Sequence, residues 1–296
     1  MVGIVLAVGL VGQLGCASRS VNSKALSGID TVQVRKDQEV YKQVGKTELT
    51  LNIFTPVTDQ MLKDRPAIVF FFGGGWSTGS PDQFEEQARY FASRGIVAFT
   101  ADYRVRTRHQ SKVVDSVADA RSAIRWVRNH SERLGVDPSR IAASGGSAGG
   151  HLAASSAFID EFDDPREDKS VSAVPNALVL FNPALALAPM SGISASELRA
   201  VPQVQFLGAE ASKISPAHHV RKNGPPTIIF HGELDKTVPH KTVLVFEKQM
   251  KEQKNKCEVV IFPGQDHGFF NRGNYRSQTI SIADEFLVSR GWLPKL

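Results

Sequence analysis

Short apolar runs alternate with longer amphipathic stretches along most of this chain. The run at 67–72 is continuously apolar, as expected of a strand buried on both faces of a sheet. Further strands are predicted at 96–101, 141–143, 177–181, 227–230 and 257–262. Helices are predicted between them, at 81–94, 112–134, 240–254 and near 276–290. This alternation predicts an α/β protein with a mostly parallel central sheet flanked by helices on both faces.

The first part of this pattern is different. From Thr31 onward, apolar and polar residues alternate through two stretches, at 32–40 and 49–53, with Gly45 between them. Strict alternation is typical of a half-buried strand, and a glycine between two such runs favours a turn. We expect two antiparallel strands at one edge of the sheet.

The N-terminus has the composition of an export leader. Residues 1–15 are apolar and uncharged, and the small residues at 16–18 follow them. This run is short for a membrane span and fits a signal peptide. Leu14-Gly15-Cys16 resembles the end of a bacterial lipoprotein leader, although Gln13 and the lack of a preceding Lys or Arg depart from that pattern. We expect an exported protein, either lipidated at Cys16 or cleaved near Ala17; a buried N-terminal strand or a wrongly assigned start is the alternative.

The leader and the predicted strands and helices divide the chain into three parts. We predict a leader at 1–17, a Ser-, Asn- and Gly-rich tether at 18–30 and one domain at 31–296. Within that domain, residues 183–224 show little periodicity and are long enough for a lid or a substrate loop. The chain of 296 residues is long enough for one large α/β domain.

Composition excludes several kinds of partner. The net charge is +5 and the basic residues are scattered, so we expect no nucleic-acid partner. The two cysteines, Cys16 and Cys257, lack the neighbours of a zinc site. The acidic stretch at 160–168 lacks calcium-loop spacing and is predicted to be solvated surface. We expect neither a metal nor a cofactor.

The strongest chemical motif is G-x-S-x-G at Gly145-Gly146-Ser147-Ala148-Gly149, between a predicted strand and a predicted helix. A serine hydroxyl attacks a carbonyl only if it projects from the backbone toward a base, and a tight strand-to-helix turn gives that projection. Side chains two residues before and after the serine would collide, so glycine is needed at both places. The following helix directs free N–H groups toward developing negative charge.

Three further loops follow predicted strands. Gly73-Gly74-Gly75-Trp76 could direct backbone N–H groups at an oxyanion. The loop at 231–239 holds Glu233 and Asp235, and the loop at 263–270 holds Asp266 and His267. Ligands bind at the carboxyl ends of parallel strands, which is where these loops are expected to lie.

The triple-glycine loop, the Ser147 turn, the aspartate loop and the histidine loop occur in that order along the chain. In this order of motifs the chain resembles the α/β-hydrolase fold. The motifs F-G-G-G-W, G-G-S-A-G-G, H-G-E-L-D-K-T-V-P and G-Q-D-H-G-F look like those of hormone-sensitive-lipase-like esterases and, more closely, of their BD-FAE-like branch. The resemblance covers roughly residues 47–290. It implies Ser147 as nucleophile, His267 as general base and acid, and Asp235 as the acid that orients His267.

The resemblance also implies an oxyanion hole built from the backbone N–H groups of Gly74, Gly75 and Ala148. The relatives usually carry a histidine before the three glycines, thought to brace the loop, where this chain has Phe72. Glu233 and Asp266 stay open as alternatives to Asp235, although side chains adjacent in sequence, such as those of Asp266 and His267, rarely meet in a triad.

Residue chemistry supports the same histidine. His267 lies in a Gly-bracketed loop after the last predicted strand. His151 falls on the predicted nucleophile helix, and His231 is expected to brace the aspartate loop. His218 and His219 fall in the irregular segment and are weaker candidates.

Together these features predict a serine carboxylesterase that hydrolyses small acyl esters through an acyl-enzyme on Ser147. The resemblance, with export, suggests acetyl or feruloyl esters of polysaccharides, and short-chain aliphatic esters fit equally well. A prolyl-oligopeptidase-like exopeptidase and a non-catalytic surface binding protein on a hydrolase scaffold are the alternatives. The sequence gives no indication of the oligomeric state.

Overall fold

The computed structural model describes residues 32–58, 62–200 and 206–296. The predicted leader at 1–17, with Cys16, and the tether at 18–30 lie outside the described residues. Within the described ranges, no helix has both the length and the apolar character that crossing a membrane requires.

Eight strands form one sheet in the order β1-β2-β4-β3-β5-β6-β7-β8. Their bounds are β1 Val34–Val44, β2 Thr47–Pro56, β3 Arg65–Phe71, β4 Val97–Ala101, β5 Val136–Gly146, β6 Ala177–Phe181, β7 Thr227–Gly232 and β8 Cys257–Phe262. β1 pairs antiparallel with β2, and β2 with β4, whereas all pairs from β4 to β8 are parallel. The edge hairpin and the mostly parallel sheet are both confirmed.

Seven α-helices lie in the described residues, and all except α2 fall near predicted positions. They are α1 Glu85–Ser93, α2 Arg106–His109, α3 Val113–Asn129, α4 Ser131–Leu134, α5 Ala148–Phe158, α6 Lys241–Glu252 and α7 Gly273–Ser289, with 3₁₀ turns η1 Pro81–Phe84, η2 Glu197–Ala200, η4 Ala211–Ile214, η5 Pro216–His219 and η6 Phe269–Asn271. The helix predicted at 81–94 begins as η1. The long helix predicted at 112–134 is interrupted at His130, where φ is −102° and ψ is 17°, so it divides into α3 and α4.

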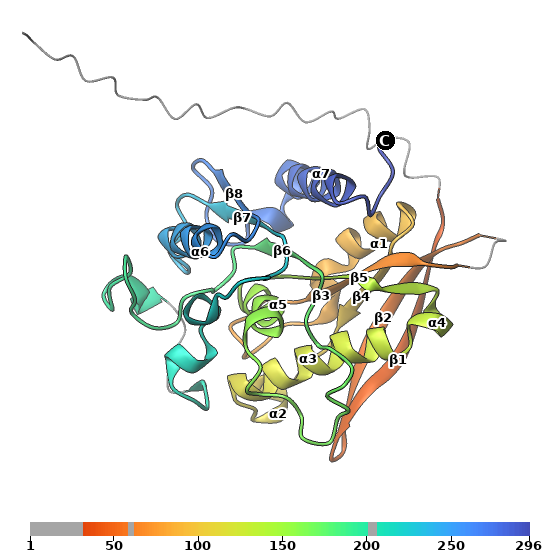
Figure 1. The fold of residues 1–296 in the computed structure, drawn as a ribbon, viewed down its shortest axis with the longest axis horizontal. Coiled ribbons are helices and arrows are strands. Elements are labelled where there is room, and N and C mark those ends of the chain that lie inside the picture. The colour runs from red at the N-terminus through yellow and green to blue at the C-terminus, as the bar shows by residue number, and fades with distance from the viewer. Residues whose placement is uncertain (1–31, 59–61, 201–205) are drawn as a thin grey trace, which may run out of the picture.

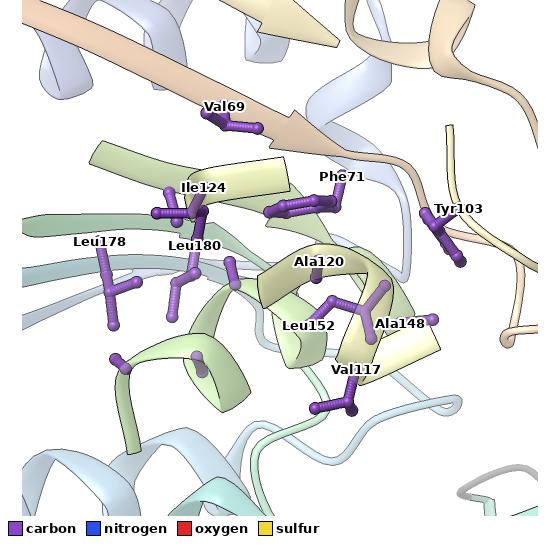
Figure 2. Packing of buried hydrophobic residues seen from close by; sticks show 14 of the residues in the cluster. Val69, Phe71, Tyr103, Val117, Ala120, Ile124, Ala148, Leu152, Leu178 and Leu180 are labelled. Atoms are coloured by element: carbon purple, nitrogen blue, oxygen red, sulfur yellow. The ribbon is translucent and has the colours of Figure 1, made fainter. Parts of the chain in front are cut away.

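The core lies on both faces of the sheet, because the parallel strands are apolar at successive positions. Along β3, Val69 and Phe71 pack on the face covered by α3 and α5, whereas Ile68 and Phe70 pack on the face covered by α1 and α7. Figure 2 shows the first face, where side chains of α3 and α5 meet those of β3 and β6. Packing on two faces holds the strand ends, and the loops that follow them, in fixed positions.

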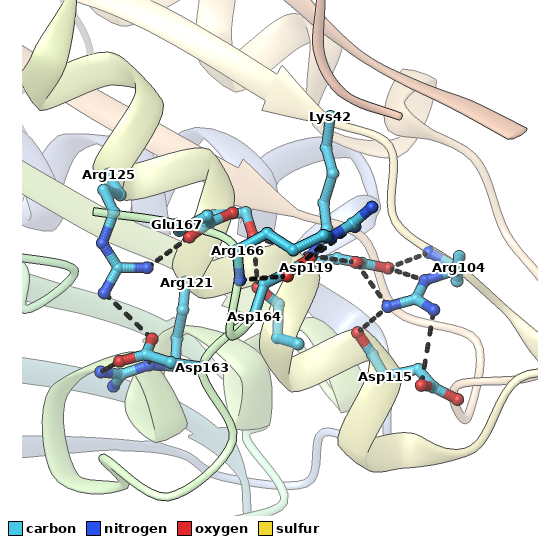
Figure 3. Close-up of polar contacts among 12 residues, drawn as sticks. Lys42, Arg104, Asp115, Asp119, Arg121, Arg125, Asp163, Asp164, Arg166 and Glu167 are labelled. Atoms are coloured by element: carbon cyan, nitrogen blue, oxygen red, sulfur yellow. Dashed lines mark hydrogen bonds and ion pairs between the residues drawn. The ribbon is translucent and has the colours of Figure 1, made fainter. Parts of the chain in front are cut away.

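A buried network of charges ties the edge hairpin to α3 (Figure 3). Asp119, fully buried on α3, accepts from Lys42 Nζ at 2.9 Å and from Arg104 Nε at 2.7 Å. Lys42 is itself almost fully buried and lies 3.3 Å from Asp164. Ion pairs this deep require partners for every charge.

Part of the acidic stretch at 160–168 takes part in this network, which corrects the prediction of solvated surface for Asp163, Asp164 and Glu167. Asp160 and Asp168 are exposed, as predicted. Asp163 pairs with Arg121 at 2.6 Å and with Arg125 at 3.0 Å, and its side chain is 11% exposed. Glu167 also pairs with Arg125. The cations come from α3, distant in sequence, and local composition could not reveal them.

We expect Asp119→Asn to lower the free energy of unfolding by about 3 kcal/mol, because it leaves two cations without their central buried carboxylate. Urea denaturation would measure the change. The matched control is Glu39→Gln, which removes an exposed partner of Arg133 and should cost less than about 1 kcal/mol. If both variants lose the same free energy of unfolding, the buried ion pairs of Asp119 do not stabilise the fold more than an exposed ion pair does.

Candidate active site

Ser147 lies at the turn between β5 and α5, in a backbone conformation that few residues adopt. Its φ is 54° and its ψ is −116°, a sparsely populated region that surrounding structure must hold in place. A Cβ on Gly149 would lie 1.9 Å from the Phe71 carbonyl oxygen, and one on Gly145 would lie 2.5 Å from it. Both glycines of the motif are therefore required by close backbone approach.

Three side chains from separate strand ends meet at this turn. Ser147 Oγ lies 2.9 Å from His267 Nε2, in position to donate its proton. His267 Nδ1 lies 2.7 Å from Asp235 Oδ2, in position to donate to the carboxylate. Asp235 follows β7 and His267 follows β8, so the parallel sheet brings together residues far apart in sequence.

Asp235 is held by donors on both carboxylate oxygens. The backbone N–H groups of Thr237 and Val238 donate to Oδ1, each at 2.9 Å, and Asn182 Nδ2 donates to Oδ2 at 2.6 Å. His231 Nε2 lies 3.2 Å from Oδ2 and 2.8 Å from the Val238 carbonyl oxygen. Burial alone would raise the pKa of Asp235, but hydrogen bonds from both histidines and Val238 hold it well below its usual range. The carboxylate is therefore ionised at neutral pH.

The two other candidate acids lie in different contacts. Glu233 Oε2 accepts from the backbone N–H of Gly264 at 3.0 Å. Asp266 pairs with Arg272. Of the three acids left open by the sequence, only Asp235 hydrogen-bonds to His267 in the described structure.

The triple-glycine loop places free N–H groups beside Ser147. The Gly73 N–H donates a hydrogen bond to Gln83 Oε1 at 2.5 Å. The loop is close to the serine, since a Cβ on Gly73 would lie 3.4 Å from Ser147 Cβ. Within the described part of the chain, the N–H groups of Gly74 and Gly75 donate to no protein acceptor. Ala148 is the first residue of α5, where N–H groups lack an intrahelical acceptor.

Gly74 cannot be replaced without moving the loop. Its φ is +124°, a conformation that side chains rarely adopt. A Cβ there would lie 2.2 Å from the Thr78 carbonyl oxygen.

Two aromatic contacts brace this loop. Phe72, which precedes the three glycines, is buried and stacks on Tyr103 with ring centroids 4.1 Å apart. Tyr103 Oη donates to the Phe72 carbonyl oxygen at 2.7 Å. The start of the loop is therefore fixed at Phe72 by packing and by one hydrogen bond.

The second brace joins Trp76 to His151 on α5. Trp76 Nε1 donates to His151 Nδ1 at 3.2 Å, and His151 Nε2 donates to the Ile214 carbonyl oxygen at 2.6 Å. These two bonds require a neutral imidazole protonated on Nε2 alone. Burial lowers the pKa of His151 to about 4, which keeps it neutral at physiological pH.

This burial predicts a specific acid sensitivity. The unfolded chain binds a proton at His151 below about pH 6.5, whereas the folded protein excludes it until about pH 4. Stability is therefore complete above the unfolded pKa and falls as the pH drops toward the folded one. In His151→Gln, the amide can accept from Trp76 and donate to Ile214 without titrating.

From about pH 7 to about pH 4, we expect the free energy of unfolding to fall by about 2 to 3 kcal/mol more in the wild type than in His151→Gln. Denaturant titrations at a series of pH values would measure the difference, and other titrating groups cancel in the comparison. Parallel pH profiles for the two proteins would refute a buried neutral His151.

Several of these positioning residues were missed by sequence reasoning. Asn182 follows β6 directly, has φ 43° and is fully buried; a polar residue after a buried parallel strand was the available signal. Gln83 and the Trp76–His151 pair gave no local signal, because their roles depend on contacts between separate loops. His218 and His219 lie in η5, where His218 Nδ1 is 2.8 Å from Ser215 Oγ and His219 Nε2 is 2.9 Å from the Ser212 carbonyl oxygen.

No group of three or more His, Cys, Asp or Glu side chains that could hold a metal ion occurs in residues 32–58, 62–200 and 206–296.

Comparison with known proteins shows that this chain is similar to esterases. The BD-FAE family model matches residues 51–250. Propionate-bound esterase 2 of Thermogutta terrifontis is 50% identical with a TM-score of 0.82, covering 88% of this chain and 97% of that one. The same enzyme phosphorylated by paraoxon is 49% identical with a TM-score of 0.81, covering 88% and 96%.

A further relative named as an ester hydrolase matches this chain over only part of its own length. The probable carboxylic ester hydrolase LipM of Mycobacterium tuberculosis is 30% identical over 238 residues, which are 75% of this chain and 54% of LipM. The chain spans about half the length of the curated relatives it matches. Because the family model matches more than half of the chain and the solved esterases align along most of it, this protein belongs to the BD-FAE family of α/β-hydrolase esterases.

Proposed function

We propose that this protein is a serine carboxylesterase that hydrolyses small acyl esters through an acyl-enzyme on Ser147. The observation that carries the proposal is the continuous hydrogen-bonded series from Ser147 Oγ to His267 at 2.9 Å and from His267 to Asp235 at 2.7 Å. Nucleophile, base and orienting acid are each within hydrogen-bond reach of the next.

In the first half-reaction, Ser147 Oγ bonds to the ester carbonyl carbon while its proton passes to His267 Nε2. The carbonyl oxygen becomes an oxyanion, and the N–H groups of Gly74, Gly75 and Ala148 are positioned to donate to it. Asp235 stabilises the imidazolium. The bond to the alcohol oxygen then breaks, and the alcohol leaves with the proton of His267.

In the second half-reaction, water gives a proton to His267 and attacks the acyl carbon. The ester bond to Ser147 breaks, and Ser147 Oγ recovers the proton as the carboxylic acid leaves. Each proton that His267 accepts is returned, so the enzyme ends the cycle in its starting state.

Bound carboxylates in a solved relative support a small acyl group. The Thermogutta esterase has been solved with propionate and with butyrate. By similarity, we propose a short-chain acyl group for this protein, with acetyl or feruloyl esters of polysaccharides as further substrates. The exopeptidase and binding-protein alternatives have no supporting observation in the described structure.

The test compares kcat/KM for 4-nitrophenyl acetate, butyrate and octanoate, beside acetylated xylan and methyl ferulate. We expect the short esters to be hydrolysed fastest. An absence of turnover on all five substrates would overturn the proposal, and aminoacyl anilides cleaved faster than esters would favour the exopeptidase.

We also propose export, on the leader-like residues 1–17. Intact-mass measurement of the exported protein distinguishes lipidation at Cys16 from cleavage near Ala17, and an unprocessed N-terminus would contradict both. The lid role of 183–224 stays a prediction.

A further inference from the structure

A cavity of about 310 Å³ lies beside the triple-glycine loop. Its wall is formed by loop residues 75–77 together with Arg106, Ser111, Val113 and Phe206. The volume is at the lower end of the range for small-molecule sites. Because Gly75 carries one of the proposed oxyanion donors, this cavity is adjacent to the place where an ester carbonyl would bind.

Arg106 supplies an unneutralised charge to this cavity. Its guanidinium carbon lies 3.9 Å from the centre of the Phe206 ring, and it forms no ion pair with any described residue. The five residues that precede Phe206 in the sequence, 201–205, include no Asp or Glu. By contrast, Arg104 and Arg108, two residues away on either side, pair with Asp119 and Asp102.

The position of Arg106 is fixed by its backbone. Its N–H donates to the Trp76 carbonyl oxygen at 3.0 Å, which ties the start of α2 to the same loop. A guanidinium stacked on a ring keeps the N–H groups at its edge available for a planar carboxylate.

Ser111 gives the cavity a second polar group. Its Oγ is buried and has no hydrogen-bond partner among the described residues. A buried hydroxyl left unpaired is unfavourable, so rotation of Ser111 toward a ligand oxygen in the cavity would be stabilised by the hydrogen bond that it gains. Trp76, Val113 and Phe206 add apolar surface, which suits a short carbon chain between two polar ends.

The chemistry of the triad indicates which part of the ester this cavity receives. His267 protonates the departing alcohol, so the alcohol must lie on the His267 side of the scissile bond. A separate open cleft of about 640 Å³ is lined by His267, Lys236 and Thr237. The cavity beside Gly75 is not lined by His267, and it is therefore available to the acyl group.

We propose that this cavity is an acyl-side subsite for esters whose acid part carries a second, anionic group, such as the half-esters of short dicarboxylic acids. Arg106 binds the distal carboxylate and Ser111 donates a hydrogen bond to it. This inference rests on the proposed esterase reaction and specifies its substrate class.

The test compares two acyl-side esters of equal length, monomethyl glutarate and methyl pentanoate, in the wild type and in Arg106→Gln. We expect Arg106→Gln to lower kcat/KM for monomethyl glutarate by about five- to tenfold, the effect of one partly exposed charge pair. The rate on methyl pentanoate should stay within about twofold, because that ester makes no charged contact. A loss on both esters, or on neither, would overturn the inference.

Arg290→Gln is the matched control. Arg290 also stacks over a phenylalanine ring, that of Phe286 at 5.9 Å, but lies at the end of α7. The same change of charge there should alter neither rate. If it lowers the glutarate rate as much as Arg106→Gln does, general electrostatic attraction replaces the subsite as the explanation.

A second pair of esters tests the assignment to the acyl side. 4-Acetoxybutanoate and butyl acetate differ by a carboxylate on the alcohol side. We expect Arg106→Gln to leave their relative rates unchanged, and a selective loss on 4-acetoxybutanoate would overturn the acyl-side assignment. The two proposals fail differently: without turnover of any ester by the wild type the esterase proposal fails, whereas turnover without dependence on Arg106 rejects this inference alone.

Discussion

Replacing Ser147 with alanine is expected to lower kcat for ester hydrolysis by about 10⁶ while the protein folds as before. Ser147 Oγ is the only hydroxyl within hydrogen-bond reach of His267 Nε2 in the described structure. Without it no acyl-enzyme forms, and what remains is the weak catalysis available from the oxyanion donors and substrate binding. Stopped or continuous assays with 4-nitrophenyl butyrate would measure the loss.

The control for this variant is Ser170→Ala, at an exposed serine in the loop after α5. It should retain full activity and stability. Thermal unfolding of both variants shows whether the fold is kept. A Ser147→Ala protein that keeps more than about one per cent of wild-type turnover would exclude Ser147 as the nucleophile.

Asp235→Asn is expected to lower kcat by about 10⁴ with little change in KM. The neutral amide of the variant cannot stabilise the imidazolium that forms on His267. Its NH₂ group also lies toward hydrogen-bond donors that face a carboxylate oxygen in the wild type. Thr237, Val238 and Asn182 all donate to Asp235, so the variant also leaves at least one of these donors poorly paired. Steady-state kinetics with the substrate of the Ser147 experiment measures the effect.

Glu233→Gln and Asp266→Asn are the matched comparisons, since the sequence left these acids open. Glu233 bonds to the backbone of Gly264 and Asp266 pairs with Arg272. Each variant should keep kcat within a factor of about three, as expected of changes away from the reacting groups. If either loses as much activity as Asp235→Asn, the acid has been assigned incorrectly.

Much of the fold could be predicted from local pattern. Buried parallel strands are continuously apolar, and the runs at 67–72 and 177–181 correspond closely to β3 and β6. The motif glycines around Ser147 were also informative, because backbone approach at Gly145 and Gly149 leaves no room for a side chain. A Cβ on Gly145 would lie 2.6 Å from the Gly149 backbone. This part of the constraint acts within a few residues and is visible in the sequence, whereas the approach of both glycines to Phe71 is not.

Features that depend on distant contacts were not predictable in this way. The acidic stretch at 160–168 was expected to be solvated, yet Asp163 pairs with cations of α3. Asn182 and His151 looked unremarkable in sequence, although one contacts Asp235 and the other Trp76. Their importance arises only when the sheet brings separate loops together, and no local periodicity reports that.

Mass spectrometry after reaction with paraoxon would show directly whether Ser147 carries the acyl group. Paraoxon phosphorylates the Thermogutta esterase, and it transfers a diethylphosphoryl group to an activated serine. We predict one such group for each protein molecule, on the peptide that contains Ser147, and none in Ser147→Ala. A group found on a different residue, or an equal extent of labelling in Ser147→Ala, would show that Ser147 is not the nucleophile.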